Sequence, residues 1–164
     1  MVLRKLNRGV VGHRGEETVC LISDRGTGII AAVADESNGW QPPFVVHRFC
    51  VRHIASNFNK VHKNQRCKNL VTYSAFQAQA RKFEKSMELV QNIDQEAVEW
   101  FNQTDSNGHM ILPKECWTLA IDGYCRFGYM TTNMAKTYNS VIKGARGLPV
   151  AALVKKIFYN CVMY

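Results

Sequence analysis

The stretch TVCLISDRGTGIIAAVADESNGWQPPFVVHRFC, residues 18–50, decides the fold class of this chain. Residues 18–22 are a short apolar run, which predicts a strand buried on both faces, as in a parallel sheet. Residues 27–34 predict a helix, and residues 44–50, rich in Phe and Val, predict a second strand. A strand, a helix and a strand in this order indicate an α/β fold with two parallel strands.

The rest of the chain is predicted to be helical from about His53 onward, so the α/β fold is mostly helical. Apolar residues that recur at steps of four and three predict one helix face: Phe76, Ala80, Phe83, Met87 and Val90. Asp94 is a predicted N-cap for the next helix, and residues 104–108 predict a polar turn. Two further helices are predicted over residues 131–143 and 150–159.

Composition and charge narrow the class of protein. The chain has 164 residues, 46% hydrophobic and 21% charged, which is typical of a globular domain. Its longest apolar runs, such as residues 29–34, fall far short of the roughly 18 residues of a membrane span. No apolar signal-peptide core is visible in the first ten residues. We therefore expect no membrane partner.

The net charge of +8 is concentrated in two blocks that contain no acid. Residues 37–83 carry eight Lys and Arg residues, and residues 123–164 carry six. A basic bias of this size favours polyanionic partners. The two blocks are interpreted either as one nucleic-acid surface or as two solvated faces.

The six cysteines are widely spread, which favours reduced thiols over a disulfide framework. Cys50, His53, His62 and Cys67 formally provide two pairs of zinc ligands. The eight residues between the pairs are fewer than in common zinc modules, so we do not expect zinc.

Asp24 is the most informative acid, because it directly follows the first predicted strand. The carboxyl ends of parallel strands are where α/β sheets place their chemistry. Carboxylates at such ends hold Mg²⁺ in phosphoryl transfer, but two or three must converge. The alternative for a single Asp is a helix N-cap or a turn residue.

Three segments of the chain resemble the transposase domain of plant Mutator-like elements, in the same order. They are CLISDRGTGI at residues 20–29, HRFCVRHIASNFN at residues 47–59, and MTTNMAKTYNSVIKGARGLPVAALVKKIFY at residues 130–159. The resemblance implies an RNase H-like core with a helical insertion and a location in the nucleus. It also implies a DDE mechanism, in which two Asp and one Glu bind two Mg²⁺ or Mn²⁺ ions. Domesticated transcription factors belong to the same group.

Matched residue by residue, Asp24 corresponds to the family's second catalytic acid, and Cys50 and His53 correspond to its Cys-x-x-His motif. The family's TTN-x-x-E-x-x-N pattern is TTNMAKTYN here, so Lys136 replaces the Glu. An ammonium group supplies a positive charge and no oxygen ligand. Lys136 therefore removes one metal ligand from the expected site.

The first catalytic Asp is also missing from the expected place. The 23 residues before Asp24 predict a helix at 2–8 and a Gly-rich turn, with no apolar strand ending in Asp. Asp24 is then a vestigial metal ligand, and we expect no resident cofactor and no catalysis. An incomplete core also leaves the strand at 18–22 with an open edge, through which copies of the chain could associate.

The resemblance divides residues 1–164 into a sheet remnant at 18–50, a helical insertion at 53–122 and C-terminal helices at 131–160. We expect a degenerate, inactive fragment of a Mutator-like transposase that retains nonspecific DNA binding. The alternative is a domesticated DNA-binding regulator. The expected phosphate contacts are Arg52, Lys60, Lys63, Lys143 and Arg146.

Overall fold

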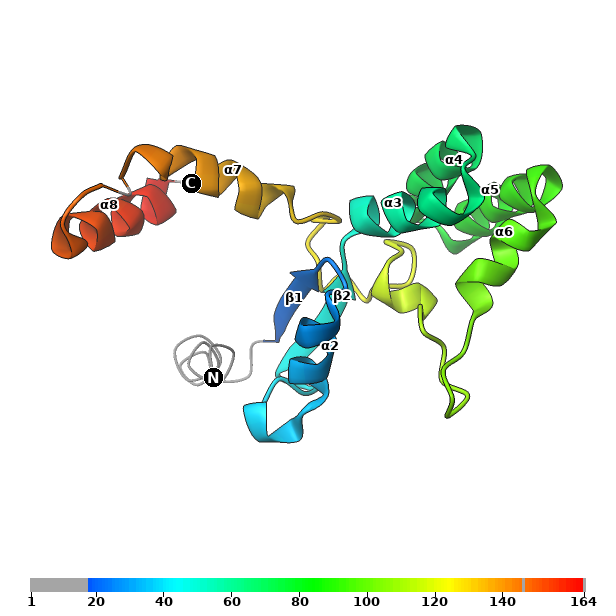
Figure 1. Cartoon of the computed structure of the whole chain (residues 1–164), viewed down its shortest axis with the longest axis horizontal. Helices are drawn as coiled ribbons and strands as arrows, with labels where there is room; N and C mark the ends of the chain where they lie inside the picture. Colours follow the sequence, from blue (N-terminus) through cyan, green and yellow to red (C-terminus); the bar gives the residue numbers. More distant parts are fainter. Residues whose placement is uncertain (1–17, 146, 164) are drawn as a thin grey trace. The chain divides into compact units, whose positions relative to one another are not determined.

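The computed structural model describes residues 18–145 and 147–163, and it shows an α/β fold that is mostly helical (Figure 1). The chain forms two compact units, of which the first ends at Thr131 and the second begins at Thr132. The helix predicted at residues 2–8 lies outside the described residues. None of the described helices is both long and apolar enough to cross a bilayer.

The first unit begins with the predicted strand–helix–strand order. Strand β1 (Val19–Ser23) is joined through helix α2 (Thr27–Ala34) to strand β2 (Val45–Phe49). The strands are parallel, and their register pairs Val19 with Val45 and Ser23 with Phe49. A short 3₁₀ turn, η1 (Glu36–Asn38), follows α2, and the Asp35 side chain caps it. The prediction of two parallel strands is confirmed.

The prediction that the first strand is buried on both faces was wrong. Ser23 is the buried residue of β1, and the other four are half-buried. In the described part of the chain the sheet has two strands, so β1 has a neighbour on one side. The apolar helix α2 likewise contains no buried residue. Among the described residues, this apolar sequence therefore does not become core, because few of the described elements cover it.

Four helices follow the sheet and form the main core of the first unit. They are α3 (Val51–His62), α4 (Gln65–Ala75), α5 (Ala80–Ile93) and α6 (Gln95–Glu99). Helix α4 packs against both α3 and α5, and α6 contacts α5. The 3₁₀ turns η2 (Trp100–Asn102) and η3 (Lys114–Cys116) complete this cluster, which surrounds the fully buried Phe58.

The predicted helix face from Phe76 to Val90 is correct in its second part only. Helix α4 ends at Ala75, so Phe76 lies at its C-cap, half exposed, and a new helix begins at Ala80. Phe76 and Ala80 are four residues apart, which matches the helical period, but a turn between two helices separates them. Phe83, Met87 and Val90 do share the core-facing side of α5.

The other local predictions hold with small shifts. Asp94 caps α6, because its side chain accepts a hydrogen bond from the Ala97 N–H at 3.2 Å. In the predicted polar turn, the Asp105 carboxylate accepts hydrogen bonds from the N–H groups of Asn107 and His109. Both features arise from short-range hydrogen bonds that the local sequence specifies.

The second unit contains α7 (Asn133–Val141), the 3₁₀ turn η4 (Lys143–Ala145) and α8 (Val150–Met163). The two helices contact each other where the Tyr138 hydroxyl donates to the Ile157 carbonyl at 3.2 Å. The two helices predicted in this region are confirmed, with the first shorter and the second longer than expected.

Candidate functional site

Asp24 lies at the end of β1 and is exposed. Its Oδ1 accepts a hydrogen bond from the Gly26 N–H at 3.0 Å, which makes a turn between the strand and α2. The N-cap of α2 is Gly26, not Asp24. Of the alternatives for this residue, the local geometry supports the turn residue.

The described residues do not fit a two-metal catalytic site. They contain no group of three or more His, Cys, Asp or Glu side chains arranged to hold a metal ion. Mg²⁺ needs several oxygen ligands in near-octahedral geometry, and Asp24 offers one carboxylate with one oxygen engaged in the turn. Lys136 is exposed on α7 in the second unit, whereas Asp24 belongs to the first.

The Cys-x-x-His motif connects the sheet to α3. Cys50 is buried, and its N–H donates to the Ser23 carbonyl at 2.7 Å, while its own carbonyl accepts from the N–H groups of His53 and Ile54. The Nδ1 atom of His53 is buried and has no hydrogen-bond partner among the described residues. In this structure, the motif fixes the start of α3.

The four formal zinc ligands are distributed over both ends of α3. His53 and His62 are nine residues apart on this helix, a separation of about 14 Å along its axis. His62 also has a different partner, because its Nδ1 lies 3.1 Å from Oδ2 of Asp94. Cys67 is buried in α4, where burial raises the pKa of its thiol.

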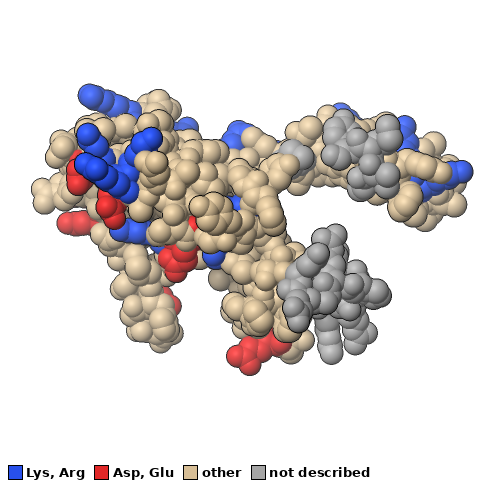
Figure 2. Space-filling model, turned by 180° about the vertical axis from the view of Figure 1, so that it is seen from behind, with Lys and Arg blue, Asp and Glu red and all other residues tan. Residues whose placement is uncertain are grey.

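Helix α3 has one apolar face and one basic face. Its buried residues include Val51, Ile54 and Phe58. Arg52 and Lys60 are exposed and lie two turns apart, and the exposed Lys63 closes the helix with a left-handed backbone. Figure 2 shows Lys and Arg side chains gathered over the helical part of the first unit, with acidic side chains beside them.

The other two predicted phosphate contacts are not on this helix. Lys143 is exposed in η4 of the second unit, and Arg146 lies outside the described residues. Of the five predicted cations, Arg52 and Lys60 are thus exposed on α3, and the exposed Lys63 is the C-cap of the same helix. We call these three residues the α3 basic face.

Sequence reasoning missed a hydrogen-bonded Ser–His pair between the strands. The Ser23 hydroxyl and the His47 Nε2 are 2.8 Å apart, although Ser23 ends β1 and His47 is the middle residue of β2. Burial, with a smaller contribution from Arg48, lowers the pKa of His47. The register pairs Ser23 with Phe49 and His47 with Leu21, so the Ser–His contact runs diagonally between the strands. The two separate sequence positions carry no signal of this contact.

A second missed feature is a buried ion pair between Asp122 and Arg126, whose side chains are at most 1% exposed. Nε of Arg126 lies 3.5 Å from Oδ2 of Asp122. The guanidinium also donates to the carbonyls of Phe49 and Glu115. Burial lowers the pKa of Arg126, and Asp122 opposes this effect. The pair therefore connects the loop to the end of β2.

The loop around this ion pair holds two exposed aromatic rings. Tyr124 is 89% exposed and Phe127 is 84% exposed. Both have positive φ angles, 62° and 49°, which are uncommon for large side chains. The Asp122 carboxylate accepts a hydrogen bond from the Tyr124 N–H at 2.8 Å, which helps to fix this backbone.

Cys20 and Cys116, near this loop, are poor nucleophiles. Burial, together with the neighbouring Cys125, raises the pKa of the Cys20 thiol to about 12. Burial also raises the pKa of Cys116. Because the thiolate is the reactive form of cysteine, neither side chain is suited to nucleophilic catalysis near neutral pH.

Comparisons of the chain with family models, with curated proteins and with solved structures find no match.

Proposed function

We propose that this chain is a degenerate, catalytically inactive relative of Mutator-like DDE transposases that retains sequence-independent DNA binding in the nucleus. The observation that carries the DNA-binding part is the α3 basic face, which lies opposite the buried face of the same helix. The helix is thereby held by its apolar side, while Arg52, Lys60 and Lys63 are exposed.

The proposed loss of catalysis is supported by two residues. Lys136 occupies the position where the related transposases carry their catalytic Glu. Asp24 is engaged in a turn, and it belongs to no group of three or more potential metal ligands among the described residues. A single carboxylate cannot balance the charge of two divalent ions or complete their oxygen shells.

DNA binding by the α3 basic face would depend strongly on salt. Each phosphate that a Lys or Arg neutralises releases counterions from the duplex. Three such contacts give a slope of log affinity against log salt of about −3. Contacts of this kind read no base edges, so duplexes of different sequence should bind with similar affinity.

A salt titration with paired variants tests this proposal. Fluorescence anisotropy of a 30-base-pair duplex, between 50 and 300 mM KCl, should show the expected slope for the wild type. Lys60→Gln/Lys63→Gln should make the slope about two units shallower. The control Arg81→Gln/Lys82→Gln removes the same charge from α5 and should leave the slope nearly unchanged. A flat slope, or equal losses in both variants, would contradict the assignment to α3.

Catalysis is tested with a supercoiled-plasmid nicking assay in Mg²⁺ or Mn²⁺. Neither the wild type nor Asp24→Asn should nick the plasmid. Nicking by the wild type that Asp24→Asn abolishes would overturn the proposed inactivity.

The domesticated-regulator alternative rests on the same basic face and differs in one measurable property. A transcription regulator binds its own site typically at least a thousandfold more tightly than random DNA. Repeated selection from a random duplex library should therefore enrich no motif if the chain is a degenerate transposase. Enrichment of one motif would favour the regulator instead.

A further inference from the structure

An open hollow lies between the sheet of the first unit and the loop at residues 122–127. Its volume is about 690 Å³, within the range of about 300–1,000 Å³ that ligand sites have. Val46 and Arg48 of β2 line it together with Thr18, and the other lining residues belong to the loop. No residue of the α3 basic face lines this hollow.

Two aromatic rings of the lining are freely accessible. Tyr124 and Phe127 are the most exposed large hydrophobic side chains in the described part of the chain, and both line the hollow. Their left-handed backbone is unfavourable for bulky residues, and water is unfavourable for apolar rings. The loop therefore keeps both rings in solvent against two local costs.

Hydrogen bonds hold the loop that carries these rings. The Arg48 guanidinium donates from β2 to the Asp122 carbonyl at 3.3 Å, and the Cys125 thiol donates to the same carbonyl at 3.0 Å. The buried Arg126 ties the loop to the end of β2 through the Phe49 carbonyl. A loop fixed before binding loses less conformational entropy when a ligand arrives.

The charges at the hollow favour an anionic partner. Asp122 is the acid of the described lining, and its side chain is buried against Arg126. Arg48 is half-buried and lines the hollow. Residues 37–83 and 123–164, which supply most of the lining, contain no Asp or Glu. An exposed pair of rings beside positive charge is typical of surfaces that bind unpaired nucleotides.

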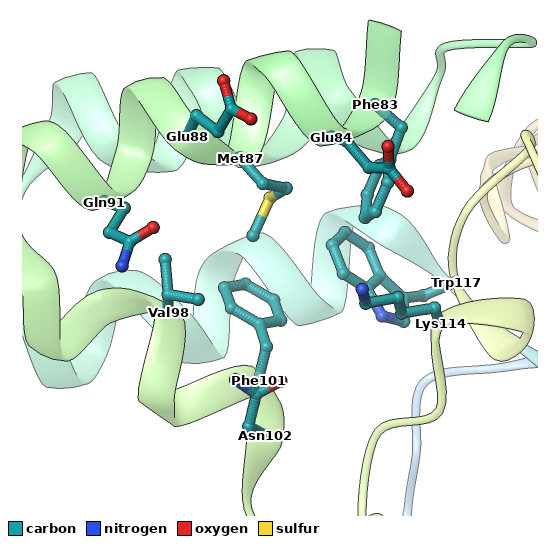
Figure 3. Close-up of a pocket in the computed structure, with 10 residues that line it drawn as sticks. All are labelled: Phe83, Glu84, Met87, Glu88, Gln91, Val98, Phe101, Asn102, Lys114 and Trp117. Carbon is teal, nitrogen blue, oxygen red and sulfur yellow. The ribbon is translucent and has the colours of Figure 1, made fainter. Parts of the chain in front are cut away.

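A second hollow, of about 280 Å³ beside α5, provides a contrast (Figure 3). Its rings, Phe83, Phe101 and Trp117, are at most 4% exposed because they pack against one another. Rings that are buried in this way offer no free face to a ligand. Stacking needs accessible rings such as those of Tyr124 and Phe127.

We infer that the loop at residues 122–127 binds single-stranded DNA, with one base stacked on Tyr124 and another on Phe127. Unpaired bases present free faces to aromatic side chains, and the adjoining phosphates are attracted to the positive charge of Arg48. This inference rests on the proposed DNA binding and adds a preference to it. The α3 basic face contacts the phosphates of DNA, whereas the loop contacts unpaired bases.

An abasic strand separates base stacking from phosphate binding, because it keeps the phosphates and lacks the bases. The full chain should bind an oligothymidylate of about 20 nucleotides about thirtyfold more tightly than an abasic strand of equal length, at about 200 mM KCl. This ratio is at the low end for two stacked bases. Fluorescence anisotropy of end-labelled strands measures both affinities. Equal affinity for the two strands would overturn the inference.

Paired variants assign the preference to the two rings. Tyr124→Ala/Phe127→Ala should abolish the ratio and leave duplex binding and the urea midpoint unchanged. Tyr124→Leu/Phe127→Leu keeps apolar side chains without a flat ring, so it should also abolish the ratio. The control Tyr73→Ala/Phe76→Ala, which removes a half-exposed Tyr and Phe near the end of α4, should keep it. A ratio that persists in either loop variant, or that is lost in the control, would contradict the assignment.

The two DNA-binding proposals fail in different ways. Duplex binding that depends on Lys60 and Lys63, with no preference for oligothymidylate over the abasic strand, would overturn the inference about the loop alone. An oligothymidylate preference without salt-dependent duplex binding would support the loop and contradict the α3 basic face. Self-association that Tyr124→Ala/Phe127→Ala abolishes, without an effect on oligothymidylate, would assign the rings to a second copy of the chain and overturn the inference.

Discussion

At the scale of single residues, the most constrained side chains are charged or titratable ones that the fold encloses. The guanidinium of Arg126 is fully buried; its terminal N–H groups donate to the carbonyls of Phe49 and Glu115, and its Nε faces Oδ2 of Asp122 at 3.5 Å without a hydrogen bond. His47 is held by Ser23. In both cases the buried group is tolerated because a specific partner replaces its hydration.

Removing one charge of the buried ion pair should be costly. Asp122→Asn keeps the oxygen that accepts from Tyr124 but leaves Arg126 as an uncompensated buried cation. We expect a loss of about 3 kcal/mol in the free energy of unfolding, measured by urea denaturation. The double variant Asp122→Asn/Arg126→Met should recover part of this loss. A double variant less stable than Asp122→Asn would show that the guanidinium contacts to Phe49 and Glu115 matter more than its charge.

The His47 side chain should make stability depend on pH. Burial lowers the pKa of His47 below its ordinary value of 6.5, so the folded state takes up this proton later than the unfolded state as pH falls. Unfolding therefore becomes easier below about pH 6.5. The midpoint of urea unfolding should fall between pH 7 and pH 5, and it should fall further in the wild type than in His47→Gln. A difference between the two proteins that does not change with pH would contradict this.

At the scale of elements, α3 is the helix that joins the main core to the candidate DNA surface. Its apolar face includes Phe58, which is fully buried and stacks on His62 with ring centres 4.6 Å apart. Phe58 also contacts Phe101 at 5.5 Å and Trp100 at 5.7 Å. The orientation of the α3 basic face therefore depends on this packing.

Truncation of Phe58 should destabilise the first unit strongly. Phe58→Ala removes a fully buried ring and leaves a cavity, so we expect a loss of about 3–5 kcal/mol in the free energy of unfolding. The control Val61→Ala, at a 61% exposed position on the same helix, should change it by less than about 0.5 kcal/mol. Urea denaturation followed by tryptophan fluorescence measures both. Similar effects of the two changes would mean that α3 is not anchored through Phe58.

At the scale of the whole molecule, the sheet of the first unit has an open edge as far as the described residues extend. The Val19 N–H donates to Phe44, and the Ser23 carbonyl accepts from Cys50, so these groups face β2. The alternation of a strand then directs the backbone groups of Cys20 and Ile22 to the other side. In the described residues β2 is the partner of β1, and that other side has no strand. Such an edge can pair with a second copy of the chain.

Self-association through this edge can be tested by sedimentation equilibrium. The wild type should associate as its concentration rises. Ile22→Pro, which removes an N–H at the open edge while leaving the β1–β2 hydrogen bonds, should shift it toward monomer. The control Ile30→Lys removes an exposed apolar residue from α2 and should still associate. A monomeric wild type would contradict the prediction, as would association lost only in Ile30→Lys.

The sequence by itself determined the features of this protein that short-range interactions control. The order of strand, helix and strand, the cap at Asp94 and the α5 stripe through Phe83 and Val90 all follow from periodicity or from hydrogen bonds within a few residues. The basic character of α3 was also readable, because its charges lie close together in the chain. The break in the helix after Ala75 could not be predicted from the sequence, because the spacing of Phe76 and Ala80 across it matches a helical period.

The tertiary structure alone decided which groups are buried and which distant groups meet. The Arg126–Phe49 hydrogen bond, the Ser23–His47 pair and the stacking of Phe101 on Trp117 join residues that no local pattern connects. The half-buried state of β1 has the same origin, because burial depends on the elements that cover a strand as well as on its own apolar residues. Hydrophobic burial and the cost of unpaired polar groups act through three-dimensional contacts, so they become visible only in the folded chain.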